Sequence, residues 1–105
     1  MKFSDALRKG AEQVDWRQAH GQLFLDTPIG MSACGLGCLI LGLGLVKADD
    51  LENLTVEYEY LAEDALQKIV PGTIWAKILH WNDGDRLLLE QIAKNLEAYE
   101  SGIDA

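Results

Sequence analysis

The sequence predicts an all-α fold, with four to five helices packed around a glycine-rich, buried central helix. Apolar side chains recur at spacings of three and four residues along most of the chain, as in helices with one buried face. A stretch of 20 residues, 27–46, carries no charged side chain, which indicates a buried segment. With 105 residues the chain is long enough for an apolar core, so we expect a single small helical domain over residues 1–105.

The amino-terminal part of the chain predicts one helix followed by a loop. The helix is expected over about residues 5–15, with Ser4 as its N-cap. Residues 16–31 lack a helical period and are expected to form a loop, in which 22–25 is a short strand-like piece.

The central helix is expected over about residues 32–41, with Ser32 as its N-cap. Small residues recur at four-residue spacing around it, which places Cys34 and Cys38 on one helix face. Such a face lets another backbone approach closely. We interpret it as tight core packing, with a homodimer contact as the second interpretation. Both cysteines are expected to be free thiols, because helix neighbours at this spacing lie further apart than a disulfide requires.

Three more helices are expected in the second half of the chain, over about residues 50–70, 73–81 and 85–100. An Asn-Asp pair lies just before the last of them. Asn82 or Asp83 is therefore expected to cap that helix by accepting backbone N–H groups.

The charge distribution favours a protein partner over nucleic acid. Asp and Glu number 17 against 9 Lys and Arg, a net charge of -8, and residues 49–105 carry all of the excess. Phosphate binding is therefore not expected, and a partner, if charged, is expected to be basic. Mimicry of nucleic acid is a further interpretation of the acidity. The amino terminus lacks the basic and apolar pattern of a secretory signal, so a cytoplasmic location is expected.

Three short motifs resemble those of an uncharacterised family of short bacterial and phage-encoded proteins. The motifs are Trp-Arg-Gln-Ala at 16–19, Ser-Ala-Cys-Gly-Leu-Gly at 32–37 and Ile-Leu-His-Trp-Asn-Asp at 78–83. The family pattern is Trp-x-Gln, Cys-Ala-Leu-Gly-Ala-Leu and Trp-Asn-Asp, and here Gly35 and Cys38 replace alanines. The resemblance implies a domain of unknown function with a phage or mobile-element connection, and it supplies no activity.

Two alternative functions involve other chemistry. A thiol-dependent hydrolase or transferase would use Cys34 as nucleophile and His80 as base, with Asn82 orienting the base and Gln18 stabilising an oxyanion. A small membrane-associated protein would use residues 28–46.

A metal site would combine Cys34 and Cys38 with His20 and His80, but the histidines lie 60 positions apart, unlike those of a zinc finger. We therefore expect no metal and no cofactor.

The preferred prediction is a small non-enzymatic binding or regulatory protein, with no nucleic acid and no membrane among its partners. An acidic helix face and the loop before the last helix are the expected contact surfaces. The same residues also have structural explanations. Trp81 would pack in the core, Asn82 or Asp83 would cap a helix, and the acidic helix face would only be a solvated surface. The candidate binding residues are Glu59, Glu63, Trp81, Asn82, Asp83 and Asp85.

Overall fold

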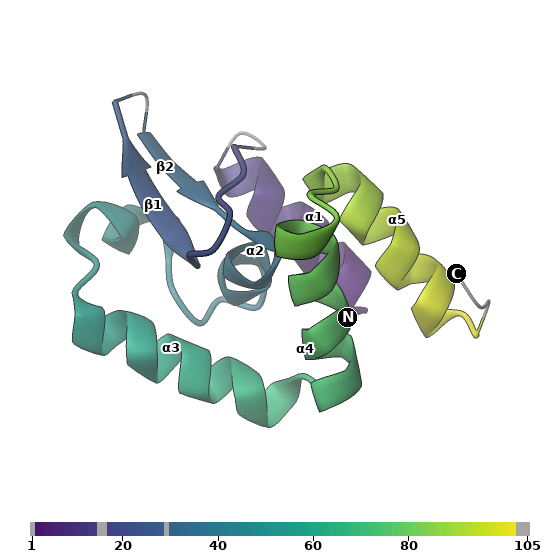
Figure 1. Cartoon of the computed structure of the whole chain (residues 1–105). Helices are drawn as coiled ribbons and strands as arrows, with labels where there is room; N and C mark the ends of the chain where they lie inside the picture. Colours follow the sequence, from purple (N-terminus) through teal and green to yellow (C-terminus); the bar gives the residue numbers. More distant parts are fainter. Residues whose placement is uncertain (1, 15–16, 29, 103–105) are drawn as a thin grey trace.

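The protein is mainly α-helical and contains one small sheet. The structure, a computed structural model, describes residues 2–14, 17–28 and 30–102. Within these residues the chain forms five α-helices and a two-stranded antiparallel sheet (Figure 1). The prediction of an all-α domain is therefore confirmed in part: the domain is mainly helical, but it also contains a small sheet. The elements are α1 (Phe3–Gln13), β1 (Phe24–Thr27), β2 (Gly30–Ala33), α2 (Gly35–Gly42), α3 (Val56–Ile69), α4 (Gly72–Leu79) and α5 (Leu89–Glu100).

The sheet is a hairpin whose second strand, β2, lies in the uncharged stretch. Phe24 pairs with Ala33 and Thr27 with Gly30, so β1 and β2 run antiparallel. The strand-like piece expected at 22–25 is thus part of a longer hairpin. Ser32, predicted to cap the central helix, instead lies in β2, and its hydroxyl donates to the Leu25 carbonyl at 3.3 Å. The helix consequently begins at residue 35.

Helix α2 forms the centre of the molecule, as predicted for the glycine-rich helix. All eight of its residues are buried, and Figure 1 shows it between α1, the hairpin and α4. A β-carbon on Gly10 of α1 would lie 1.7 Å from the carbonyl oxygen of Cys38, and one on Gly42 would lie 1.7 Å from that of Ala6. The small-residue face of α2 is therefore covered by α1 of the same chain, consistent with the core-packing interpretation.

Helix α1 begins two residues before the predicted start, and its cap comes from the other end of the chain. The backbone N–H groups of Phe3 and Ser4 donate to the Glu100 carboxylate at 2.7 and 2.9 Å. Ser4 is inside the helix instead of capping it, and its buried hydroxyl has no hydrogen-bond partner within the described residues. Glu100 thus supplies the acceptors that Ser4 was expected to supply.

The second half of the chain contains more breaks than the sequence predicts. A 3-10 helix, η1 (Ala48–Asn53), precedes α3, which begins after Thr55; the Thr55 hydroxyl accepts the N–H of Tyr58 at 3.1 Å. A π-helical turn, η2 (His80–Gly84), follows α4 directly. Helix α5 begins only at Leu89, with no side-chain cap, so the prediction that Asn82 or Asp83 caps it is wrong.

The uncharged stretch is divided between strand β2 and the eight-residue helix α2. No helix in the described part of the chain has the length and apolar character needed to cross a membrane.

Candidate binding site

Asn82 is the centre of a buried polar network beside the start of α2. Its side chain is 1% exposed and makes four hydrogen bonds. Oδ1 accepts from the Gly35 backbone N–H at 3.0 Å and from Gln18 Nε2 at 2.9 Å. Nδ2 donates to the Ala19 carbonyl at 3.0 Å and to Asp83 Oδ1 at 2.7 Å. The hydrogen-bonding capacity of the amide is used up, so Asn82 caps α2 and has a structural role.

Gln18 and Asp83 extend this network to two loops. Gln18 Nε2 also donates to the Leu87 carbonyl at 2.6 Å, which ties residues 85–88 to the segment before β1. Asp83 Oδ1 also accepts from the Gly21 backbone N–H at 2.9 Å. Three of the residues singled out by the sequence therefore meet in space, where they join loops that are more than sixty residues apart.

Cys34 lies next to the network, and its surroundings do not suit a nucleophile. The thiol is 4% exposed and accepts from the Gly37 backbone N–H at 3.4 Å as the N-cap of α2. Burial raises the pKa of Cys34 to about 11, against the lowering effect of the backbone hydrogen bonds. The thiol is therefore protonated at neutral pH, whereas nucleophilic cysteines need the thiolate.

His80 does not complete a thiol site. Its side chain is exposed on η2, with Nε2 3.5 Å from Asp85 Oδ2, and no hydrogen bond joins it to Cys34 among the described residues. Gln18 and Asn82 are committed to each other and to the backbone. The set Gln18, Cys34, His80 and Asn82 thus has no geometry for general base catalysis.

The four residues considered for a metal site do not form one in the described part of the chain. Cys38 is fully buried, and burial together with the neighbouring Cys34 raises the pKa of its thiol. His20 and His80 are exposed. The described residues hold no group of three His, Cys, Asp or Glu side chains that could bind an ion.

An acidic cavity lies between α3, α4 and the start of the hairpin. It has a volume of about 420 Å³, and Glu59, Glu63 and Asp83 all line it. Glu59 and Glu63 come from successive turns of α3, and Asp83 comes from η2. The remaining lining is mainly apolar or small: Gly21, Gln22, Leu23, Phe24, Cys34, Leu36, Trp75 and Leu79.

The three carboxylates have different electrostatic environments. Burial raises the pKa of Glu59, and the nearby charge of Glu63 raises it further. Asp83 already accepts two hydrogen bonds, from the Gly21 N–H and from Asn82, so its position is fixed. A cation in the cavity would relieve the repulsion between Glu59 and Glu63 and would meet a preoriented Asp83.

In comparisons with known proteins, no family model, no curated protein and no solved structure matches this chain. The resemblance of the three motifs to the family of short bacterial and phage-encoded proteins therefore remains a prediction.

The other three candidate binding residues lie outside the lining of the acidic cavity. Asn82 is buried in the network, and Asp85, exposed directly after η2, lies beside His80. Trp81 is half-buried and packs against the core, with Lys77 Nζ 5.9 Å from its ring centre. Trp75 lines the cavity instead, six residues earlier on α4.

Sequence reasoning did not single out Trp75, Phe24 or Leu23 as site residues. An apolar residue in a helix or strand is usually a core residue, so the sequence has no signal that separates these three from the core. Leu23, Phe24 and Trp75 line a common cavity only because the segment 21–24, which leads into the hairpin, lies near α3 and α4.

Proposed function

We propose that this protein is a non-enzymatic binding protein, whose acidic cavity takes a basic side chain of a partner protein. The observation that carries the proposal is that Glu59, Glu63 and Asp83 line one cavity together with Trp75. Carboxylates pair with an ammonium or guanidinium group, and an indole ring attracts a cation to its face. The apolar side chains in the lining suit the aliphatic stem of a lysine or arginine.

Long-range electrostatics support the same class of partner. The net charge of -8 attracts basic proteins and repels nucleic acid over distances of about a Debye length. A bound cation would also favour ionisation of Glu59, whose pKa is raised in the free protein. Protonation of Glu59 removes a charge that binds the cation, so binding is expected to weaken as the pH falls through that raised pKa. The loss of binding should therefore begin at a higher pH than it would for a glutamate with an ordinary pKa.

The test is a titration of the protein with two peptides that differ only in one side chain, lysine or glutamine. A double variant, Glu59→Gln with Glu63→Gln, removes two charges from the cavity. The matched control, Glu57→Gln with Asp64→Asn, removes two charges from exposed positions of the same helix that lie outside the cavity lining. Both variants change the net charge from -8 by the same two units.

We expect the lysine peptide to bind, the glutamine peptide not to bind, and added salt to weaken the complex. The cavity variant should lose at least about tenfold in affinity, corresponding to roughly 1.4 kcal/mol, while the control changes by less than about twofold. Equal losses in the two variants would assign binding to overall charge and contradict a site in the cavity. Absence of any preference for lysine would contradict the proposed function itself.

A further inference from the structure

Helix α3 carries more than half of the exposed large apolar side chains in the described part of the chain. There are seven such side chains, and four of them lie on this one helix: Val56, Tyr60, Leu61 and Ile69. Only Ala62 and Leu66 of the helix are buried, and Figure 1 shows α3 along one edge of the molecule. Single exposed apolar residues are common on protein surfaces, whereas neighbouring ones indicate an interaction surface.

Two of these side chains, Val56 and Tyr60, are neighbours on the helix surface. They are four positions apart, so their β-carbons lie about 5–6 Å from each other. Val56 is 66% exposed and Tyr60 is 64% exposed. Tyr58, by contrast, is half-buried, and its hydroxyl donates to Asp50 Oδ2 at 3.4 Å. Val56 and Tyr60 therefore form an outward-facing apolar patch, which we call the Val56–Tyr60 patch.

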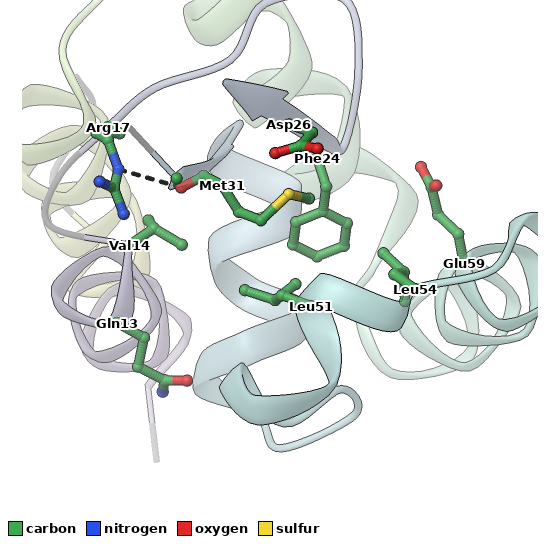
Figure 2. Close-up of a pocket in the computed structure, with 10 residues that line it drawn as sticks. Gln13, Val14, Arg17, Phe24, Asp26, Met31, Leu51, Leu54 and Glu59 are labelled. Carbon is green, nitrogen blue, oxygen red and sulfur yellow. Dashed lines mark hydrogen bonds between the residues drawn. The ribbon is translucent and has the colours of Figure 1, made fainter. Parts of the chain in front are cut away.

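The Val56–Tyr60 patch adjoins the edge of the acidic cavity. Glu59 follows Val56 by three positions and Glu63 follows Tyr60 by three, so each glutamate has one residue of the patch as its neighbour on the helix surface. Both glutamates line the acidic cavity. Glu59 lies at its boundary, because it also lines a second cavity together with Leu54 (Figure 2). A partner that reaches the two glutamates is therefore next to the patch.

The charges around Tyr60 favour a basic partner over a second copy of this chain. Its neighbours three and four positions away are Val56, Glu57, Glu63 and Asp64, so three of the four carry carboxylates. A second copy that docked through the same face would bring these carboxylates together, and each copy has a net charge of -8. Exposed carboxylates add little affinity each, but they repel acidic partners. The patch thus fits a basic partner.

We propose that Val56 and Tyr60 are the apolar part of the binding surface, on which the basic partner lays an apolar side chain next to the basic side chain held in the acidic cavity. This inference rests on the proposed function. Tyrosine is enriched at protein interfaces, because its rigid ring supplies a large contact area at a small cost in conformational entropy. The recognised feature is then a basic residue with an apolar residue beside it, which is more selective than a basic residue alone.

The experiment titrates the full isotope-labelled chain by NMR with three glycine-serine peptides. Two of them have a central lysine, with leucine or alanine two positions away on both sides, and the third has glutamine in place of lysine between leucines. Apolar residues on both sides allow the peptide to run in either direction. Tyr60→Ser removes the larger side chain of the patch. Leu61→Ser is the matched control, because Leu61 is 69% exposed on the same helix and its neighbours three and four positions away do not include Glu59 or Glu63.

We expect the lysine peptide with leucines to bind about tenfold more tightly than the lysine peptide with alanines, which corresponds to partial burial of one leucine side chain. Its binding should shift the backbone signals of Val56 and Tyr60. Tyr60→Ser should reduce the preference for leucine to less than about twofold, while Leu61→Ser retains it. Thermal melting checks that both variants fold, and the peptide comparison on the unmodified chain tests the inference without either variant.

The outcomes separate this inference from the proposed function. Preference for lysine without preference for leucine would overturn the inference and leave the proposed function in place. Preference for leucine without preference for lysine would overturn the proposed function and the inference with it. Equal losses of the leucine preference in Tyr60→Ser and Leu61→Ser would assign it to general apolar surface and overturn the patch. Sedimentation without peptide tests the other occupant, since a dimer that Tyr60→Ser dissociates would assign the patch to a second copy.

Discussion

The side-chain oxygen of Asn82 accepts a hydrogen bond from the backbone N–H of Gly35 at 3.0 Å, and so caps the central helix from 47 positions further along the chain. The first N–H groups of a helix have no partner within it, and a buried one must find an acceptor. Asn82 also makes hydrogen bonds with Gln18, Ala19 and Asp83. One side-chain amide therefore connects three parts of the fold: the start of α2, the segment before the hairpin, and η2.

Replacement of this amide should destabilise the fold strongly. Asn82→Ala leaves the Gly35 N–H and the Ala19 carbonyl buried without their partner, which should lower the free energy of unfolding by about 2–4 kcal/mol. Urea unfolding measures the change. Asp85→Ala, at an exposed position next to the same turn, is the control and should cost less than about 0.5 kcal/mol. Equal midpoints for Asn82→Ala and the unmodified protein would contradict the capping role.

The contact between α1 and α2 requires glycine. Gly10→Ala should cost about 3 kcal/mol or more, because its β-carbon would meet the Cys38 carbonyl oxygen and backbone cannot yield easily. Gly42→Ala should behave alike, since its β-carbon meets the Ala6 carbonyl oxygen at the same distance. Gly72→Ala is the control, as no atom lies within 4 Å of its β-carbon, and it should leave stability unchanged or raise it by about 0.5 kcal/mol. Thermal melting ranks the three variants.

The Glu100 carboxylate should contribute more to stability than the exposed Glu97 carboxylate, three residues earlier on α5. Glu100→Ala removes both acceptors of the α1 N-terminus and should cost about 1 kcal/mol. Glu97→Ala, which breaks an exposed ion pair with Arg8 at 3.1 Å, should cost less than about 0.5 kcal/mol. Both variants place alanine in α5, so helix propensity is matched. A larger loss for Glu97→Ala would show that the ends of the chain are held by the ion pair instead.

Native Cys34 should react slowly with alkylating agents. A pKa of about 11 in place of 9.0 leaves about a hundredfold less thiolate near pH 8, and burial restricts access as well. Alkylation followed by mass spectrometry should therefore show a rate in the folded protein at least about a hundredfold below that in urea. Equal rates in the two conditions would revive the thiol-enzyme hypothesis.

The same raised pKa predicts a loss of stability at alkaline pH. The folded state holds the neutral thiol, so the contribution of Cys34 is complete below the pKa of 9.0 that an unburied thiol has, and it is lost as the pH rises through about 11. Cys38, whose pKa is also raised by burial, should add to the effect. Urea unfolding at a series of alkaline pH values should show falling midpoints over this range. Constant midpoints up to pH 11 would contradict burial of the thiols.

Several features follow from the sequence alone. The three- and four-residue periods predict the helical segments, because a helix must bury one face, and the uncharged stretch predicts that its helix is central. The acidity of the second half predicts carboxylates on α3, and Glu59 and Glu63 do face one cavity. These are properties of composition and local pattern, which a sequence records directly.

The distant helix caps, the hairpin and the site were decided only by the tertiary structure. Local reasoning gives each helix a cap from the residue before it, and Cys34 does cap α2 in this way. The N–H groups of Phe3 in α1 and of Gly35 in α2, however, donate to Glu100 and Asn82, which are 97 and 47 positions away. Asp83 joins Glu59 and Glu63 only because the fold brings η2 to the same cavity as α3. Hydrogen bonds and cavities depend on which surfaces meet, and residue spacing carries no record of those distant contacts.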